Sequence, residues 1–251
     1  MLPSPAILFL LIKLFFLPEN DFKKAQCRYP RVRYAYAQKQ QDFDKLLKEK
    51  GIHLQAFNLY LQVFKKEQEL VLYAKNNGDK KFHYLKTFPI CASSGNYGPK
   101  RQQGDRQVPE GFYHIDRFNP SSNYYLSLGI NYPNASDKIL GHQAALGGDI
   151  FIHGACVTIG CVPIEDEGIM ELYMACVEAR NNGQARIPVT IFPAKMTVSN
   201  IRNLKEQHPV SKATEQLWFS LAKAYDYFEE TQQLPRIQFL DDGTHRVYAG
   251  H

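Results

Sequence analysis

Phe151-Ile152-His153-Gly154-Ala155-Cys156-Val157-Thr158-Ile159-Gly160-Cys161 is the most specific stretch of this sequence. Its apolar start predicts a buried strand that presents a histidine at its end. A cysteine follows eight residues later, directly after a glycine. Glu165, Asp166 and Glu167 then open a helical pattern, at the helix end where the dipole favours acidic side chains. A strand, a histidine, a loop, a cysteine and a helix therefore follow one another closely.

The histidine and the cysteine of this stretch predict nucleophilic catalysis. A thiol needs a base or a positive field to become a thiolate near neutral pH. His153 at a strand end can supply the base, and Cys161 shortly before a helix can use the free backbone N–H groups there. Such N–H groups can also form an oxyanion hole. The pattern therefore suits acyl transfer through a thioester on Cys161, with His153 as the general base.

Two other interpretations of the same residues stay open. His153, Cys156 and Cys161 could bind a metal ion, although the stretch offers no fourth ligand and no closely paired cysteines. Alternatively, the thiols are structural and lie beside a core histidine. Cys91 and Cys176 lie within apolar patterns and are expected in the core. Cys156 is expected either in the core or paired with Cys161 on oxidation.

Hydrophobic periodicity predicts strands before this stretch and helices after it. Short apolar runs from Phe57 to Ile90, separated by turn signals, indicate an antiparallel meander, and a functional loop is expected over 92–111. Trp218 is expected on the core face of a C-terminal helix. Further strands are expected over 112–118, 124–132, 149–153 and 188–192. Helices are expected over 40–50, 165–183, 200–207 and 212–231, before a final hairpin near 241–243.

The composition is that of a globular protein, with 44% hydrophobic and 22% charged residues among 251. No apolar run reaches the roughly 18 residues of a membrane span, which excludes a polytopic membrane protein. The formal net charge of +5 is a mild excess, so no nucleic-acid partner is predicted. Five cysteines are too few for a disulfide scaffold.

The N-terminus is interpreted as an export signal. Residues 6–17 are apolar except for Lys13, a length that suits a secretory signal peptide, although no basic residue precedes them. Residues 23–39 contain lysines and arginines but no acid, and are expected to form a solvated basic linker. A membrane anchor and a buried helix of a cytosolic protein are the alternatives.

Glycine- and proline-containing segments precede the central stretch in a fixed order. They are Ser94-Gly95-x-x-Gly98-Pro99-Lys100, Gly104-Asp105, Pro109-Glu110-Gly111-x-Tyr113 and Leu128-Gly129-x-Asn131-Tyr132-Pro133-Asn134. Together with His153-Gly154-x-Cys156-x-Thr158-x-Gly160-Cys161, they resemble the L,D-transpeptidase catalytic domain (YkuD-like) family, in its murein branch of the YafK or DpaA type. The resemblance covers residues 55–195. The commoner family motif has a histidine where this chain has Ile159, and a polar residue where it has Pro163.

The resemblance implies an α+β fold with a mainly antiparallel, β-sandwich-like core, a helix after the catalytic cysteine and a helical C-terminal extension. It implies that Cys161 is the nucleophile and His153 the general base. The backbone carbonyl of Gly154 would orient the other ring nitrogen of the histidine. Thr158 replaces the serine of the motif, and the backbone of Gly160 and Cys161 would contribute an oxyanion hole.

Four residues are candidate substrate contacts: Ser94, Lys100, Tyr132 and His142. Lys100 suits a carboxylate of a stem peptide, and Tyr132 suits the wall of a cleft. The alternatives are an exposed loop charge for Lys100, a packed side chain for Tyr132 and a solvated loop residue for His142. Glu110 precedes a predicted strand and is expected to make a structural hydrogen bond rather than to act in catalysis.

These expectations describe an exported bacterial enzyme of the cell wall. The expected parts are a signal or anchor segment with its basic linker over 1–39, a catalytic domain over 40–195 and a helical extension over 196–251. The implied substrate is the peptidoglycan stem peptide, a wall-linked protein is a further potential partner, and no cofactor is needed. Rival functions are a hydrolase that cleaves a diaminopimelate–lysine or stem-peptide bond, and a non-catalytic wall-binding module.

Overall fold

The computed structural model describes residues 22–142 and 145–250. The apolar residues 6–17, interpreted above as an export signal, lie outside this part of the chain. Within the described residues, no helix is long and apolar enough to cross a membrane.

The described residues form ten strands and six helices. The strands are β1 (Phe57–Phe64), β2 (Glu69–Asn76), β3 (His83–Pro89), β4 (Gly111–Asn119), β5 (Ser127–Ile130), β6 (Phe151–His153), β7 (Val162–Pro163), β8 (Ile187–Phe192), β9 (Arg236–Phe239) and β10 (His245–Tyr248). The helices are α1 (Phe22–Gln26), α2 (Pro30–Glu49), α3 (Ala135–Leu140), α4 (Glu165–Asn181), α5 (Val198–Gln207) and α6 (Lys212–Thr231).

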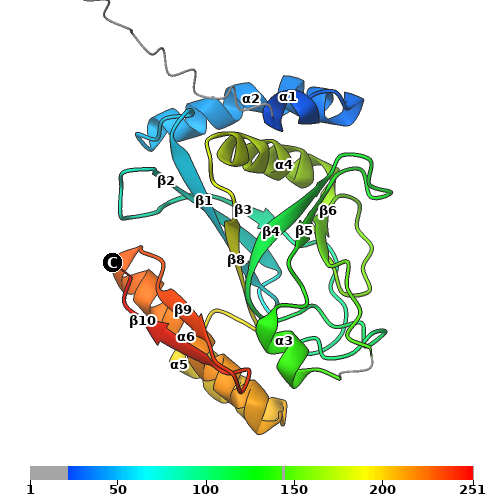
Figure 1. Ribbon diagram of the computed structural model, residues 1–251, viewed down its shortest axis with the longest axis vertical. Coiled ribbons are helices and arrows are strands. Elements are labelled where there is room, and N and C mark those ends of the chain that lie inside the picture. Colours follow the sequence, from blue (N-terminus) through cyan, green and yellow to red (C-terminus); the bar gives the residue numbers. More distant parts are fainter. Residues whose placement is uncertain (1–21, 143–144, 251) are drawn as a thin grey trace, which may run out of the picture.

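One curled sheet of eight strands runs in the order β3-β2-β1-β8-β4-β5-β6-β7 (Figure 1). The meander β1-β2-β3 is antiparallel, as predicted. Strand β8, the last of the sheet in sequence, enters its centre between β1 and β4 and runs parallel to β1. A second parallel pair, β6 and β7, lies at the edge. This edge pair carries the stretch from which the sequence analysis began.

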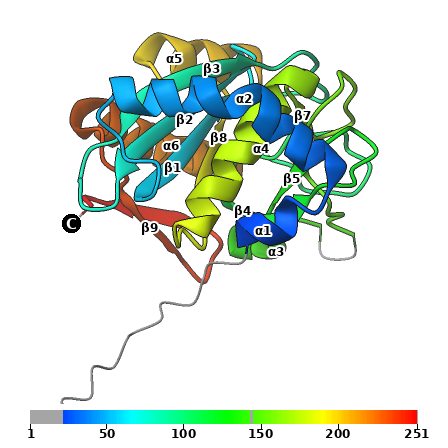
Figure 2. The same cartoon turned by 90° about the horizontal axis from the view of Figure 1, so that it is seen from above.

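Helices cover both faces of the sheet. Helix α4 lies against one face, and α2 packs across α4 (Figure 2). Leu61 and Val63 of β1 are fully buried on this side, in the main core. Phe64 belongs to a second apolar cluster, which it shares with Trp218 of α6 on the opposite side. Because both faces of β1 are covered, its sequence is an almost continuous apolar run rather than a polar–apolar alternation.

The predicted fold class is confirmed in its main features. The protein is α+β, a helix follows Cys161, and the C-terminal extension is helical. Helix α6 has the predicted bounds, and Ser211 caps it by accepting a hydrogen bond from the Thr214 N–H. The β9–β10 hairpin that follows forms a separate two-stranded sheet.

The structure corrects the expectation of a basic linker over residues 23–39. These residues form α1 and the first half of α2, which begins with a proline in its first turn. The reason is an apolar stripe that recurs every three to four residues among the basic side chains, and it faces α4. The buried residues of α2 are Val32, Ala35, Tyr36, Phe43 and Leu47.

Candidate active site

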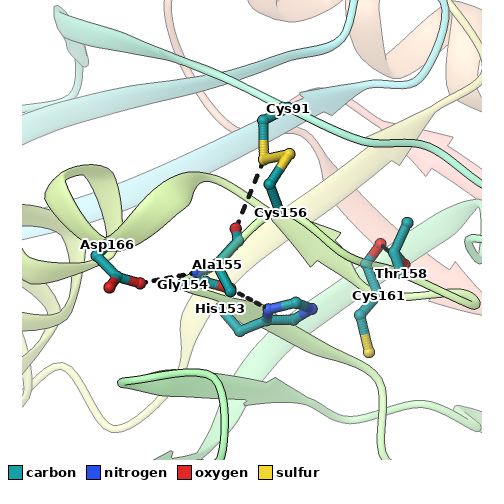
Figure 3. Close-up of a disulfide and its surroundings, with 8 residues drawn as sticks. All are labelled: Cys91, His153, Gly154, Ala155, Cys156, Thr158, Cys161 and Asp166. Atoms are coloured by element: carbon teal, nitrogen blue, oxygen red, sulfur yellow. Dashed lines mark hydrogen bonds between the residues drawn. A yellow bond between two sulfur atoms is a disulfide. The ribbon is translucent and has the colours of Figure 1, made fainter.

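The parallel pair β6–β7 brings the histidine and the cysteine to one edge of the sheet. Its register pairs Ile152 with Val162 and His153 with Pro163. Ile152 and Val162 both point into the main core, so their chain neighbours His153 and Cys161 share the other face of the two strands. Figure 3 shows the imidazole ring extending toward the Cys161 side chain. The two groups singled out by the sequence therefore lie on the same face of the sheet edge, with the ring directed toward the cysteine.

The imidazole of His153 is held in one tautomer. Its Nδ1 lies 2.5 Å from the carbonyl oxygen of Gly154, which can only accept a hydrogen bond (Figure 3). Nδ1 therefore carries the proton, and Nε2 keeps a free lone pair. His153 is 1% exposed, and this burial lowers the pKa of the imidazole, while the hydrogen bond to Gly154 acts in the opposite direction. The resting histidine is thus neutral and able to accept a proton at Nε2.

A tyrosine covers the face of this imidazole. The ring centroids of Tyr124 and His153 are 4.6 Å apart, with an interplanar angle of 32°. The Tyr124 carbonyl also accepts a hydrogen bond from the Gly154 N–H. Arg31 of α2 fixes the loop on both sides of Tyr124, because its guanidinium donates to the carbonyls of Ser122 and Tyr125. The N-terminal helix therefore helps to position the histidine.

Cys161 carries a free, partly buried thiol. Its Sγ accepts a hydrogen bond from the Phe151 N–H at 3.4 Å and lies 3.7 Å from the Asp149 carbonyl. Burial raises the pKa of the thiol, and the charge of Asp149 raises it further. The Phe151 N–H and the charge of Lys100 lower it. A raised pKa favours the protonated thiol, so forming the thiolate requires a base, and His153 lies on the same face of the sheet edge.

The loop between the two residues depends on two glycines. A Cβ on Gly154 would lie 2.5 Å from the Asp166 carboxylate and 2.8 Å from the Tyr124 carbonyl. Gly160 has a φ of +135°, and a Cβ there would approach the Gln107 carbonyl to 3.0 Å. Asp166 also accepts a hydrogen bond from the Ala155 N–H, which ties the loop to the first turn of α4.

Thr158 braces the end of the same loop. Its Oγ1 donates to the Cys161 carbonyl at 2.8 Å and accepts from the Gly160 N–H at 3.0 Å. The Gly160 N–H can therefore join an oxyanion hole only if it leaves Thr158. This arrangement gives Thr158 a defined structural task, which is to hold the turn that presents Cys161.

Comparison with known proteins identifies this arrangement. Residues 58–191, more than half of the chain, match the family model described as the L,D-transpeptidase catalytic domain, YkuD. The chain belongs to the L,D-transpeptidase catalytic domain family. It is 37% identical over 185 residues to YafK of Escherichia coli K12, whose name assigns it to the L,D-transpeptidases provisionally. The alignment covers 73% of this chain and 71% of YafK, and the O157:H7 protein gives the same values.

Two kinds of solved structure also resemble this L,D-transpeptidase domain. One is the helical cell shape determining protein Pgp2 from Campylobacter jejuni, which is 19% identical in sequence and has a TM-score of 0.43. The superposition covers 79% of this chain and 80% of the Pgp2 chain. The other is Bd1075 from Bdellovibrio bacteriovorus, with 17% identity, 72% and 76% covered, and a TM-score of 0.40.

The structure corrects the expectations for two cysteines of the domain. Cys91 and Cys156 form a disulfide, with Cα atoms 5.6 Å apart and a separation of 65 positions in sequence (Figure 3). Cys91 is therefore not a core thiol, and Cys156 does not pair with Cys161. The metal interpretation needed Cys156 as a thiolate ligand, and the disulfide occupies that sulfur. Cys176 is fully buried, as predicted.

The four candidate substrate contacts occupy different environments. Lys100 is 5% exposed and pairs with Asp105 at 2.5 Å, and Tyr132 is buried with its hydroxyl donating to the Leu146 carbonyl at 3.1 Å. His142 is exposed at the end of a described segment. Ser94 lines a pocket, and its Oγ is buried. Lys100 and Tyr132 thus support the loops of the site, Ser94 is half-buried with an inaccessible hydroxyl, and His142 is exposed.

Glu110 makes the structural hydrogen bonds predicted for it. Its Oε1 accepts from Lys65 Nζ and from the Gly98 N–H, both at 2.7 Å, and its Oε2 accepts from Trp218 Nε1 at 2.7 Å. Lys65 also donates to the carbonyls of Asn96, Gly98 and Val108. Sequence reasoning missed Lys65, because its partners lie at least 31 residues away along the chain.

A second buried network, also missed, lies under the Lys100 loop. Asp137 is 2% exposed, and its carboxylate pairs with Arg101 at 2.8 Å and accepts from the Tyr113 hydroxyl at 3.0 Å. Burial raises the pKa of Asp137 to about 6, although Arg101 acts in the opposite direction. The capping box of Asn134 and Asp137 at the start of α3 is the sequence signal that could have located it.

Proposed function

We propose that this protein is an exported bacterial L,D-transpeptidase that acts on peptidoglycan stem peptides through a thioester on Cys161. The observation that carries the proposal is the His153 imidazole, fixed through Nδ1 on the Gly154 carbonyl and directed with its free Nε2 toward Cys161. A neutral histidine with one available nitrogen, beside a free thiol, is what acyl transfer requires.

In the first half of the reaction, Nε2 of His153 accepts the Sγ proton of Cys161. The thiolate then attacks the carbonyl carbon at the L-centre of diaminopimelate. The imidazolium returns its proton to the leaving amine, and the next residue of the stem peptide departs. In the second half, His153 takes a proton from the incoming amine, which attacks the thioester and releases the thiol. The net reaction exchanges one amide for another, so no oxidant, metal or cofactor takes part.

A hydrolase is the second candidate. Ile159 and Pro163 stand where the commoner family motif has polar residues, and Ile159 is 78% exposed. A changed surface next to the cysteine favours a changed acceptor or leaving group. In the hydrolase, water takes the place of the amine, and the bond cleaved joins diaminopimelate to a lysine of a wall-linked protein or to the rest of a stem peptide.

The test is treatment of purified sacculi with the wild-type protein and with Cys161→Ala, followed by mass analysis of the muropeptides. New 3–3 cross-links or exchanged terminal residues, absent with the variant, are expected of a transpeptidase. Release of peptide or protein without new cross-links would replace this proposal with the hydrolase. If neither change appears, the non-catalytic wall-binding module becomes the better account.

A further inference from the structure

One partner of an exposed ion pair contacts the nucleophile. Arg117 of β4 and Asp149, in the loop before β6, are joined through Nη1 and Oδ1 at 2.6 Å. The backbone carbonyl of Asp149 is the group that lies 3.7 Å from Cys161 Sγ. The two charged side chains are 43% and 79% exposed. An exposed ion pair contributes little to stability, so folding alone does not account for this one.

The strand register places Arg117 on the face of the sheet that carries the catalytic pair. Gly129 of β5 pairs with Arg117 on one side and with Phe151 on the other. Phe151 lies two positions before His153 along β6, so the two side chains point to the same face as Cys161. The Arg117 guanidinium lies 4.9 Å from the centre of the Phe151 ring.

The glycine between the two strands makes this arrangement possible. A Cβ on Gly129 would lie 2.9 Å from Arg117 Nε and 3.1 Å from Phe151 Cε1. Any larger residue would therefore displace the guanidinium or the aromatic ring. Because Gly129 leaves this room, Arg117 extends across β5 and reaches Asp149 in the loop before β6.

The backbone of Asp149 is strained. Its φ of +56° lies in the left-handed region, which residues with a Cβ enter only at a cost in free energy. Strain of this kind is concentrated at binding and catalytic sites, where the surrounding structure maintains it. The charge of Asp149 also acts on Cys161, since it raises the pKa of the thiol.

Both members of the pair keep hydrogen-bonding capacity for a ligand. Asp116 accepts from Arg117 Nε at 3.2 Å, and Asp149 accepts from Nη1. Across residues 22–142 and 145–250, no hydrogen bond involves Arg117 Nη2 or Asp149 Oδ2. The pair therefore offers a cationic donor and an anionic acceptor side by side, next to the nucleophile.

We infer that Arg117 and Asp149 bind the D-centre of diaminopimelate, the amino-acid group at the far end of its side chain. This centre carries an ammonium and a carboxylate on one carbon, which match the carboxylate of Asp149 and the guanidinium of Arg117. Only three methylene groups separate it from the L-centre, so it lies close to Sγ when Cys161 attacks the L-centre carbonyl. The inference rests on the proposed function and deepens it, because the pair would select diaminopimelate over residues without this zwitterion.

The experiment measures binding in a Cys161→Ala background, in which no peptide is consumed. Three tetrapeptides L-Ala–γ-D-Glu–X–D-Ala are titrated by calorimetry. In them X is diaminopimelate, lysine, which lacks the D-centre carboxylate, or 2-aminopimelate, which lacks the D-centre ammonium. Loss of either group should weaken binding about tenfold or more, the range of a lost charge-assisted hydrogen bond.

Each substitution should abolish the preference for the group that the side chain contacts. With Arg117→Met added, the lysine peptide should bind within about twofold of the diaminopimelate peptide. With Asp149→Asn added, the same should hold for the 2-aminopimelate peptide. Arg202→Met and Asp226→Asn, at exposed positions of α5 and α6, are the matched controls and should keep the ratios of the parent protein.

A purely structural role of the pair has a different signature. Either substitution would then lower the midpoint of thermal unfolding and weaken all three peptides alike, so that their ratios stay unchanged. That result would overturn the inference. Equal affinities for the three peptides in the parent protein, or no binding of any of them, would overturn it as well.

Release of D-Ala from the diaminopimelate peptide by the wild-type protein tests the proposed function separately. If D-Ala is released while the three peptides bind equally well, the inference fails and the proposed function stands. If the peptides are discriminated as expected but no D-Ala is released, the proposed function fails and the zwitterion site stands.

Discussion

At the residue scale, the resting environment opposes the ion pair that the proposed reaction needs. Burial lowers the pKa of His153 and raises that of Cys161, so both shifts favour the neutral thiol and the neutral imidazole. The Gly154 carbonyl acts in the opposite direction on His153, and the Phe151 N–H and the charge of Lys100 do so on Cys161. The ring of Tyr124 also lies over the imidazole. An aromatic ring stabilises a cation stacked against it, and here that cation would be the imidazolium.

Tyr124→Ala should therefore slow alkylation of Cys161 near pH 7, by about threefold to tenfold, because the imidazolium loses its cation–π partner. Tyr124→Phe keeps the ring and should behave as wild type. The measurement is the rate of iodoacetamide modification between pH 5 and 9, followed by intact mass in a Cys27→Ser background, since Cys27 is also free. Equal profiles for the alanine and wild-type proteins would remove Tyr124 from the site.

At the scale of single elements, the short helix α3 gives the fold a pH-dependent stability. The pKa of Asp137 is about 6 in the folded protein, above its ordinary value of 3.8. The folded state therefore binds this proton more tightly than the unfolded state. The resulting stability is complete below about pH 4 and is lost as the pH rises through about 6.

Asp137→Asn should remove this contribution. Relative to the variant, the wild-type free energy of unfolding is expected to fall by about 2–3 kcal/mol between pH 4 and pH 7. Urea unfolding at several pH values measures it, and the difference between the two proteins cancels the contributions of the other carboxyl groups. Loss of the Arg101 ion pair shifts the free energy of unfolding of the variant by an additional amount, so the test is how the difference between the two proteins changes with pH. If the free energies of unfolding of the two proteins vary in parallel with pH, the prediction is contradicted.

The loop between His153 and Cys161 is a second element with a testable constraint. The Cys91–Cys156 disulfide ties it to the segment after β3, across 65 residues of sequence. Closing a loop of that length restricts the unfolded chain by about 4 kcal/mol in the chain-entropy description.

Cys91→Ser/Cys156→Ser should lower the free energy of unfolding by about 2–5 kcal/mol and reduce activity on sacculi, because the turn that presents Cys161 loses an anchor. The double variant avoids new free thiols that would compete for an alkylating agent. Cys27→Ser is the control for a cysteine outside the disulfide. Unfolding curves that coincide for the oxidised wild-type protein and the double variant would show that the disulfide does not form.

Sequence reasoning was most reliable for these elements where local pattern decides the structure. Periodicity and caps predict the meander, the helix after Cys161 and the bounds of α6. His153 and Cys161 could be linked as a pair because they are only eight residues apart in the sequence. The failures concern partners that are distant in sequence. Nothing near Cys91 points to Cys156, and the parallel pairing of β1 with β8 joins residues more than 120 positions apart. In α2, basic side chains between the buried positions obscured the apolar stripe.

At the scale of the whole molecule, the C-terminal extension is connected to the loops of the site through buried hydrogen bonds. Trp218 of α6 donates to Glu110, and Glu110 pairs with Lys65, whose ammonium holds three carbonyls of the 92–111 loop. Lys65 and Glu110 are both buried, so each requires the other. Packing of α6 on the sheet is thus coupled to the loop that borders Cys161.

Trp218→Phe tests this coupling without emptying the core. Phenylalanine keeps most of the packing but cannot donate to Glu110 Oε2, which would be left buried without its hydrogen bond, at a cost of about 1–3 kcal/mol. We expect that loss in urea unfolding, together with faster amide exchange in residues 92–111 and a higher KM for the stem peptide. Thr214→Ser, in the first turn of the same helix, is the control for a mild change in α6. If Trp218→Phe loses stability while exchange in the loop stays as in wild type, α6 stabilises the sheet alone, and the extension does not reach the active site through Glu110.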